Sequence, residues 1–351
     1  MIIVQSYLEE FLEDQRMAMQ DDGHNDVGAW IGKSAAARAL IEESERLASS
    51  HFNIHITGPI GVGKKVMATR IHNLSGRLKF VSFRCGLWGK DNSEKLLFGY
   101  VKKDQKGTSK FYPGALQMAH GGSLYLEGLE SLHPVLQDKL AQALNEGKVY
   151  PVGSSKAVAC DIRVLSSASI SLEAMINRDK LTSNLADEIG GTTLNIPPLT
   201  NRKEDIPLLI EYFKNKLWEQ STRRINLESN AIEALCNYPW PGNGRQLFKV
   251  MEKISLTSEE NISLEDLPEE LITGSPIHSE TEDTSNGTSA HLVPNDATWK
   301  EYRRITDRVF IARILKQHSG NITRAAQQLN VNRETVHRWI NELGLKKENA
   351  S

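Results

Sequence analysis

Apolar and polar positions follow two alternating patterns through the first 200 residues of the chain. Short runs rich in β-branched and other apolar residues predict buried strands. These runs lie at residues 51–58, 79–85, 121–128 and 160–169. Apolar residues at helical spacing predict amphipathic helices over residues 34–49 and 64–75. Strands that alternate with helices indicate a parallel sheet with helices on both faces.

Two changes of pattern follow this region. Residues 201–272 have a helical pattern, strongest over 203–218, which predicts a small helical subdomain after the sheet. The next stretch is rich in Ser, Thr, Glu, Asn and Gly and lacks apolar periodicity, as is typical of a flexible linker. We therefore predict five segments: a short leader (1–27), an α/β core (28–199), a helical subdomain (200–272), a linker (273–296) and a C-terminal helical domain (297–351).

The C-terminal domain has the pattern of two short helices joined by a tight turn. Gly320 is expected to end a preceding amphipathic helix, and the next helix covers residues 322–329. Asn330 and Val331 form the turn, and Asn332 caps the last helix. This spacing predicts a helix-turn-helix, a motif whose second helix lies in the major groove of DNA.

Polar and basic side chains of this motif are candidate DNA contacts. Arg pairs with guanine and Glu accepts from cytosine, whereas phosphate contacts fix the register of the protein on the duplex. The predicted DNA-binding residues are Thr323, Arg324, Asn332, Arg333, Glu334, Thr335, His337 and Arg338. Residues 297–351 contain eleven Lys and Arg against five Asp and Glu, a net charge of +6. Since the whole chain carries a net charge of −2, residues 1–296 carry −8. This asymmetry favours double-stranded DNA as the partner, and the alternative is a helical protein-interaction domain with a solvated charged face.

Composition excludes several classes of protein. No apolar run approaches the ~20 residues that a membrane-spanning helix needs. The N-terminus lacks the charged, apolar and small-residue order of a secretory signal. Three widely spaced cysteines give neither a disulfide framework nor a zinc pattern. We expect a cytoplasmic protein without membrane association and without a metal cluster.

A glycine-rich turn follows the first predicted strand and precedes the second predicted helix. Such a turn exposes backbone N–H groups to one anion, the helix dipole adds to the attraction, and a lysine reaches the outer phosphates. The predicted phosphate-binding residues are Gly58, Gly61, Val62, Gly63, Lys64 and Lys65. Lys65 occupies the position where a Ser or Thr hydroxyl would hold magnesium. The pattern predicts ATP or another nucleotide as ligand, with magnesium a candidate ion, and the alternative is an ordinary glycine-rich turn.

Further motifs occur in a fixed order along the chain. They are WIGKSAAARALIEESERLASS, LLFGY, PGALQMAHGGSLYLEGLE, LQDKLAQALNEGKVYPVG, IPPLTNRKEDIPLLIEYF, YPWPGNGRQL and NITRAAQQLNVNRETVHRWINELGL. In these motifs the chain resembles the bacterial enhancer-binding proteins, which are AAA+ activators of sigma-54 RNA polymerase. The resemblance implies a fold of class α/β, an AAA+ P-loop parallel sheet with a helical lid, plus a C-terminal all-α helix-turn-helix of Fis type that acts as a dimer. It also implies that the nucleotide lies between core and lid, and that Arg245 is the lid arginine that senses the γ-phosphate.

The chain departs from this family in the loop that contacts the polymerase. Family members carry the sequence GAFTGA there, and the aligned residues 103–108 are Lys-Asp-Gln-Lys-Gly-Thr, of which only Gly107 is shared. A charged and polar loop lacks the apolar Phe that would contact the sigma factor. We therefore interpret this segment as a solvated loop.

The chain also departs from the family in the groups that cleave ATP. Glu127 and Gly128 stand where the family has Asp and Glu, so Glu127 remains a candidate magnesium ligand and Gly128 cannot act as a base. Ser169 stands at the polar sensor position, and Thr182 and Glu188 stand where trans-acting arginines would be. General-base catalysis contributes ~10²–10⁴ in rate and an arginine finger ~10³–10⁵. We expect a domain that binds nucleotide and hydrolyses it poorly or not at all.

The leading hypothesis is a sequence-specific DNA-binding transcriptional regulator that does not remodel sigma-54 polymerase. Its expected partners are promoter or enhancer DNA, an RNA polymerase holoenzyme and further copies of the chain, as a dimer or higher oligomer. Because only about 27 residues precede the core, we expect no receiver domain and no regulation by its phosphorylation. One alternative is an active sigma-54-dependent ATPase with a diverged contact loop. Another is an adaptor in a mixed ring, and a nucleotide second messenger is an alternative ligand.

Overall fold

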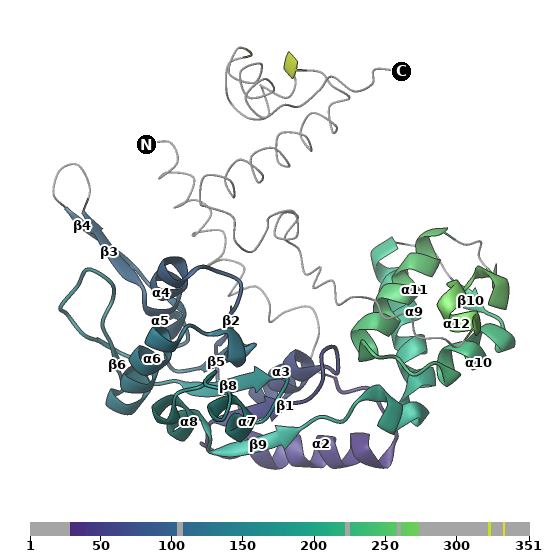
Figure 1. Cartoon of the computed structure of the whole chain (residues 1–351), viewed down its shortest axis with the longest axis horizontal. Helices are drawn as coiled ribbons and strands as arrows, with labels where there is room; N and C mark the ends of the chain where they lie inside the picture. Colours follow the sequence, from purple (N-terminus) through teal and green to yellow (C-terminus); the bar gives the residue numbers. More distant parts are fainter. Residues whose placement is uncertain are drawn as a thin grey trace. The chain divides into compact units, whose positions relative to one another are not determined.

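The computed structural model describes residues 29–103, 108–221, 225–257 and 261–273, together with Ile322, Thr323 and Arg333. Contacts divide the chain into two units, residues 1–277 and 278–351. Figure 1 labels the elements of the first unit and colours them in the order of the sequence. In the second unit the three described residues are helical, and the rest of the predicted helix-turn-helix lies outside the described residues. No helix in the described part of the chain has the length and apolar character needed to cross a membrane.

A five-stranded parallel sheet forms the centre of the first unit. Its strand order is β2-β5-β8-β1-β9. The strands are β1 (Ile54–Thr57), β2 (Phe80–Arg84), β5 (Ser123–Glu127), β8 (Arg163–Ala168) and β9 (Thr192–Asn195). The first four lie within the four runs predicted from apolar residues, so the predicted parallel sheet is confirmed. The sequence analysis did not predict β9, whose buried position Leu194 lies between exposed or half-buried polar residues.

Helices cover both faces of this sheet. They are α2 (Ala35–Ala48), α3 (Lys64–Leu74), α4 (Lys90–Phe98), α5 (Ala115–Met118), α6 (Pro134–Glu146), α7 (Leu172–Ile176) and α8 (Ser183–Ile189). Along β5, Leu124 and Leu126 join one apolar cluster and Tyr125 joins another, so side chains of both faces are buried. Helices α2 and α3 confirm the two helices predicted from apolar spacing.

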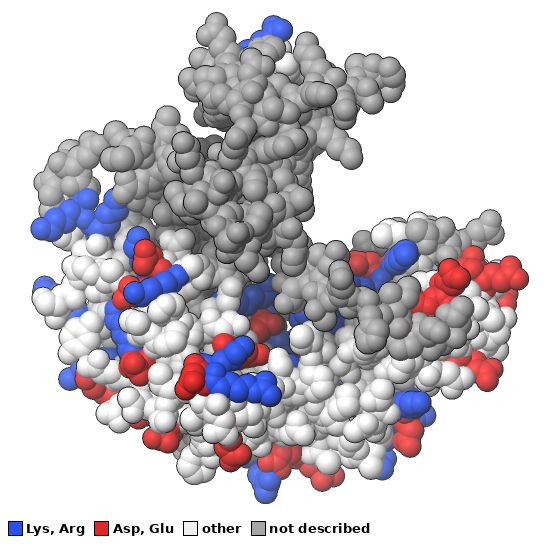
Figure 2. Space-filling model, viewed as in Figure 1, with Lys and Arg blue, Asp and Glu red and all other residues white. Residues whose placement is uncertain are grey.

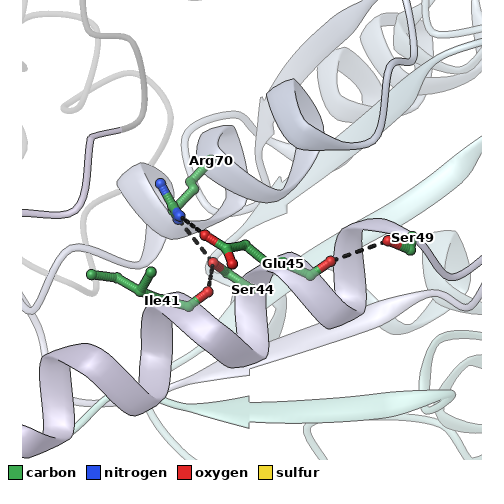
Figure 3. A network of polar contacts seen from close by, with 5 residues as sticks. All are labelled: Ile41, Ser44, Glu45, Ser49 and Arg70. Atoms are coloured by element: carbon green, nitrogen blue, oxygen red, sulfur yellow. Dashed lines mark hydrogen bonds and ion pairs between the residues drawn. The ribbon is translucent and has the colours of Figure 1, made fainter.

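Helices α2 and α3 are joined by polar contacts as well as by apolar packing (Figure 3). Arg70 of α3 donates to Oγ of Ser44 and to the Glu45 carboxylate of α2, both at 2.8 Å. The Ser44 hydroxyl donates in turn to the carbonyl of Ile41 at 2.6 Å. These bonds fix the register between the helix that precedes β1 and the helix that follows it.

The lid is a helical subdomain with its own apolar cluster. Its elements are η2 (Leu199–Asp205), α9 (Ile206–Ser221), α10 (Ser229–Asn237), α11 (Asn243–Thr257), η3 (Leu264–Asp266) and α12 (Glu269–Thr273), with the parallel pair β10 (Asn226–Leu227) and β11 (Asn261–Ile262). The structure therefore confirms the predicted helical subdomain. At the centre of its cluster, Trp240 is almost fully buried, and its indole N–H donates to the carbonyl of Leu235 at 2.7 Å.

A short antiparallel hairpin, β3 (Tyr100–Lys103) and β4 (Ser109–Tyr112), lies at the end of the core opposite the lid in Figure 1. Lys102 is paired with Lys110 in its register. Figure 2 shows basic side chains gathered over this hairpin, whereas basic and acidic groups lie side by side over much of the remaining face. A second antiparallel pair joins β6 (Lys148–Val149) to β7 (Val158–Ala159), and the 3-10 turn η1 (Leu129–Ser131) follows β5.

Candidate functional site

The glycine-rich turn connects β1 to α3 at the carboxyl edge of the sheet. Lys64 is the first residue of α3, and Gly63 precedes it with φ +103°, in the left-handed region. The Lys64 ammonium donates to the carbonyl oxygens of Gly58 at 2.6 Å and Pro59 at 3.0 Å. Two carbonyl groups of the turn thus hold the Lys64 ammonium beside the N-terminus of α3, and such an N-terminus favours an anion.

The ammonium of Lys64 is partly shielded from water. Burial lowers its pKa, and the nearby charge of Arg245 lowers it further. The charges of Glu130 and Glu127 act in the opposite direction, with Glu130 the stronger of the two. Charged groups from three other elements, β5, η1 and α11, therefore lie near Lys64.

Helix α11 of the lid begins directly on the glycine-rich turn. Asn243, the first residue of α11, donates from Nδ2 to the carbonyl of Ile60 at 2.8 Å and accepts at Oδ1 from the Leu199 N–H at 2.7 Å. It is 2% exposed and has φ +51°, a left-handed conformation that Asn tolerates better than most residues. Two residues later, the backbone N–H of Arg245 donates to the carbonyl of Gly61 at 3.2 Å. These bonds bring Arg245 to the phosphate loop.

A second connection between lid and loop runs through η2. Arg202 donates from Nη2 to the carbonyl of Val62 at 2.8 Å, and its guanidinium lies 4.8 Å from the ring centroid of Trp30. Asp205 is fully buried and accepts from the N–H groups of Lys33 and Ser34 at 2.7 and 2.8 Å. The same 3-10 segment thus binds both the turn and the segment that leads into α2.

Glu127, the last residue of β5, and Glu130, three residues later in η1, contact different neighbours. Glu127 forms an ion pair with Arg84 at the end of β2, at 3.2 Å. Glu130 lies in η1, and its Oε1 accepts from the N–H and the hydroxyl of Ser169, at 3.1 and 2.8 Å. Ser169 directly follows β8. Two carboxylates and a lysine therefore meet at one edge of the sheet.

Comparisons with known proteins identify the family. Three family models match: the sigma-54 interaction domain over residues 30–195, the AAA+ ATPase lid domain over 200–284, and the bacterial regulatory protein, Fis family, over 303–343. Transcriptional regulatory protein ZraR of Escherichia coli is 30% identical over 310 residues, which are 87% of this chain and 67% of ZraR. The chain is a bacterial enhancer-binding protein.

Other relatives of the enhancer-binding family are longer than this chain. The acetoin dehydrogenase operon transcriptional activator AcoR of Bacillus subtilis is 30% identical over 91% of this chain and 51% of its own length. The formate hydrogenlyase transcriptional activator FhlA of E. coli is 30% identical over 97% of this chain and 48% of its own length. The chain thus spans about half the length of these two relatives.

Solved enhancer-binding structures have the same fold. NtrX from Brucella abortus in complex with ATP matches with a TM-score of 0.64 and 29% identity, over 90% of this chain and 70% of NtrX. The NtrX complex with ADP matches with a TM-score of 0.63 and 27% identity, over 97% and 74%. These matches confirm the AAA+ fold, and the Fis-family match confirms the C-terminal helix-turn-helix as part of the fold.

The positions where this chain departs from the enhancer-binding pattern can be located in the structure. Gly128 joins β5 to η1 with φ +71°. Thr182 precedes α8, and its N–H donates to the Gln137 side chain at 2.8 Å. Glu188 lies within α8 and accepts from the Asn145 amide at 3.0 Å. Within the segment aligned with GAFTGA, residues 104–107 lie outside the described residues, and β3 and β4 flank them.

The structure brings most of the predicted phosphate-loop residues together with Arg245, through the bonds described above. Lys65 is the second residue of α3. Of the predicted DNA-binding residues, Thr323 and Arg333 are described and exposed, and the other six lie outside the described residues. The sequence analysis missed the roles of Asn243, Arg202 and Glu130. The Pro-Gly-Asn sequence before Arg245 was an available indication of Asn243, because Asn favours the left-handed conformation that it adopts.

The carboxylates at this edge fit a magnesium ion. Magnesium binds oxygen ligands and typically uses one or two carboxylates, phosphate oxygens and several waters. Lys65 supplies no hydroxyl, and Glu127 shares its charge with Arg84. However, Oε2 of Glu130 is buried and has no hydrogen-bond partner among the described residues. Glu127 would therefore be the carboxylate that holds the ion, and Oε2 of Glu130 is available to accept from a water molecule.

Proposed function

We propose that this chain is a sequence-specific DNA-binding transcription regulator that binds ATP or another nucleotide in its AAA+ domain and hydrolyses it slowly or not at all. A contrast among its residues carries the proposal. The phosphate loop keeps Lys64 and its contacts with the lid, whereas Gly128 has no side chain and Thr182 and Glu188 carry no positive charge. Binding and cleavage of a nucleotide depend on different groups, so one can persist without the other.

Nucleotide binding is the better supported half of this proposal. The expected contacts are Gly58, Gly61, Val62, Gly63, Lys64, Lys65 and Arg245, with Glu127 as a magnesium ligand. NtrX, which has the same fold, has been solved with ATP and with ADP. A magnesium ion bound with the nucleotide would be held by Glu127 and would offset the negative charge of the phosphates. The loop and the lid arginine would orient the nucleotide between them.

The test of nucleotide binding is a titration of the full chain with ATP, ADP and cyclic dinucleotides, together with steady-state phosphate release. Lys64→Ala is expected to weaken binding at least tenfold, because it removes the cation of the loop. Lys148→Ala, an exposed lysine of β6, is the matched control and should bind as the unmodified chain does. Phosphate release at a rate typical of active AAA+ relatives would contradict slow hydrolysis.

The second unit would bind promoter or enhancer DNA as a dimer or higher oligomer. The segments expected from the sequence, with a core at 28–199, a lid at 200–272, a linker at 273–296 and a DNA-binding domain at 297–351, are part of this proposal. Arg338→Ala should lower the affinity for the preferred site about tenfold or more and relax specificity. Lys346 follows the last predicted helix and is expected to contact phosphate rather than bases. Lys346→Ala should therefore weaken binding to all duplexes alike and reduce the slope of log affinity against log salt by about one. Equal loss on specific and unrelated duplexes in Arg338→Ala would contradict base recognition.

We further propose that the regulator acts in the cytoplasm with an RNA polymerase holoenzyme and without remodelling its sigma-54 form. The sequence Lys-Asp-Gln-Lys-Gly-Thr in place of GAFTGA supports this part. The alternative, an active sigma-54-dependent ATPase, is favoured by the match to the sigma-54 interaction domain. Expression of the regulated promoter in cells with and without sigma-54 separates the two. Loss of the regulation in cells that lack sigma-54 would favour the alternative.

A further inference from the structure

Glu130 occupies a position at the edge of the sheet that the family pattern does not assign to a carboxylate. It follows the end of β5 by three residues, in η1, after the left-handed Gly128. Two hydrogen bonds from Ser169, one from the backbone and one from the hydroxyl, hold its Oε1. The Glu130 carboxylate therefore lies at the end of β8 although its backbone follows β5.

The strand order shows which side of the edge each glutamate occupies. β8 lies between β5 and β1, and the phosphate loop follows β1. The bond to Ser169 thus directs Glu130 toward the phosphate loop. Glu127 pairs with Arg84 at the end of β2, so its carboxylate lies on the side of β5 that is farther from the loop.

The second oxygen of Glu130 is without a partner. Oε2 is buried and accepts no hydrogen bond from any residue that the structure describes. A buried polar atom that lacks a partner carries a free-energy cost, and bound water or a ligand commonly removes it. Consistent with a position beside the phosphate site, the charge of Glu130 acts on Lys64 more strongly than that of Glu127.

We propose that Glu130 is the water-activating carboxylate of this site, in place of the side chain that is absent at Gly128, and that Ser169 positions it. The proposal rests on the nucleotide binding proposed above. Glu130 would accept a proton from a water molecule while the water oxygen forms a bond to the terminal phosphorus. The bond from that phosphorus to the bridging oxygen breaks, and its electron pair stays on the nucleoside diphosphate. The proton then passes from Glu130 to solvent, and the products are a nucleoside diphosphate and inorganic phosphate.

This assignment makes the slow hydrolysis dependent on one residue. Glu130 lies two positions beyond the usual one, and no arginine replaces Thr182 or Glu188. We therefore expect turnover that is measurable but slow. A general base contributes ~10²–10⁴ to the rate, so removal of the Glu130 carboxylate should cause a measurable fall in phosphate release even though the rate of the unmodified chain is low.

The experiment uses the full chain and two readouts, the affinities for ATP and ADP in magnesium and the release of phosphate. Glu130→Gln is expected to lower phosphate release at least tenfold. It should also raise the affinity for ATP relative to ADP at least threefold, because it removes a negative charge beside the terminal phosphate. Glu173→Gln, an exposed glutamate of α7, is the matched control, and both quantities should stay within twofold of the unmodified chain.

Two further variants separate positioning from general structure. Ser169→Ala should lower phosphate release severalfold, and Ser169→Thr, which keeps the hydroxyl, should restore most of it. Glu127→Gln should lower phosphate release less than Glu130→Gln does, because its carboxylate points toward Arg84.

Each outcome is decisive. If the unmodified chain binds no nucleotide, the proposed function fails and this assignment fails with it. If it binds ATP but releases no phosphate, or if Glu130→Gln leaves the rate within twofold, only the role of Glu130 is overturned. An affinity ratio that is unchanged in Glu130→Gln, or a larger loss of rate in Glu127→Gln, also overturns it.

Discussion

At the scale of single residues, the sheet contains polar side chains that are paired across neighbouring strands. His55 of β1 has no exposed surface, and its Nδ1 lies 2.8 Å from Oγ of Ser166 on β8. Tyr125 and Ser167 form a similar pair between β5 and β8, at 2.8 Å. Burial lowers the pKa of His55 from 6.5 to about 4, so the folded protein holds this imidazole neutral.

The neutral His55 makes the stability of the first unit dependent on pH. Between the folded pKa of about 4 and the unfolded pKa of 6.5, the unfolded chain binds a proton that the folded chain does not. The contribution of His55 to the free energy of unfolding should therefore be constant above about pH 7.5 and should fall as pH decreases. The contribution of His55 between pH 7.5 and 5.0 is about 2 kcal/mol.

Urea titrations at these two pH values measure the effect. Between pH 7.5 and 5.0, the free energy of unfolding of His55→Gln should fall by about 2 kcal/mol less than that of the unmodified chain. His51→Gln, an exposed histidine before β1, serves as the control and should lose as much as the unmodified chain. An equal loss in His55→Gln would mean that other groups, including the buried His72, cause the dependence.

Which site residues could be predicted depends on where their partners lie. The phosphate loop is local, because strand, turn and helix N-terminus lie within a dozen residues, and the spacing of its glycines and lysine identifies it. Glu130 meets Ser169, which is 39 positions away, and Asn243 meets Ile60, which is 183 positions away. No pattern within one segment indicates such pairs, and only the fold brings them together.

At the scale of elements, the ends of α2 illustrate the same difference. Ser34 caps the N-terminus by accepting from the Ala37 N–H at 3.0 Å, which a sequence motif can predict. At the other end, Arg163 at the start of β8 donates to the carbonyls of Leu47, Ala48 and Phe52, at 2.6, 3.2 and 3.0 Å. The helical pattern in the sequence predicts both ends of α2 within one residue. It does not identify Arg163 as the partner of the C-terminal end.

Loss of the Arg163 guanidinium should destabilise the first unit strongly. The side chain is 1% exposed, and Arg163→Met would leave several buried carbonyl groups without donors. We expect the free energy of unfolding to fall by about 3 kcal/mol or more. Arg38→Met, an exposed arginine of α2 with one bond to the Lys33 carbonyl, should cost less than about 1 kcal/mol. Similar losses in the two variants, measured by urea titration, would show that the bonds to α2 contribute little.

The contact between the phosphate loop and α11 can be tested with a pair of glycines. A Cβ at Gly61 would overlap the carbonyl oxygen of Gly242, and φ there is +79°. Gly121 has nearly the same φ, +74°, but an added Cβ meets nothing within 4 Å among the described residues. Both alanine variants carry the left-handed strain of ~1 kcal/mol, and only Gly61→Ala also displaces the start of α11.

We therefore expect Gly61→Ala to lower the affinity for ATP at least tenfold and Gly121→Ala to change it less than twofold. Fluorescence titration with a labelled ATP measures both. Equal affinities in the two variants would contradict a role for lid docking in nucleotide binding.

At the scale of the whole molecule, the chain separates into two units that differ in charge. The first unit, residues 1–277, carries a net charge of −4, and the second unit carries +2, because four acidic residues at 278–296 offset part of the +6 of residues 297–351. The sequence pattern leads us to expect a linker in this part of the chain, since a polar stretch without apolar periodicity separates two patterned regions. The hairpins and β9 could not be predicted in this way, because each of their strands buries at most one side chain, whereas β1, which is no longer than β9, buries all four.

Separate units should respond separately to their ligands. At a hundred times its dissociation constant, ATP should stabilise the first unit by about 2.7 kcal/mol, a rise in Tm of about 5–10 °C. Calorimetry of the full chain should show this rise in one transition, and a DNA duplex should shift the other. Lys64→Ala should remove the effect of ATP only. If ATP moves both transitions equally, the two units unfold as one.

The β3–β4 hairpin has a consequence for how function is distributed over the molecule. The described pairing extends from Tyr100 opposite Tyr112 to Lys103 opposite Ser109, so residues 100–103 and 109–112 account for the described stem. Substitutions beyond these residues therefore leave the described contacts of the stem, the phosphate loop and the sheet in place. Under the proposed function, partner choice and nucleotide chemistry are encoded by separate stretches of this protein, and either can be lost, kept or regained by itself.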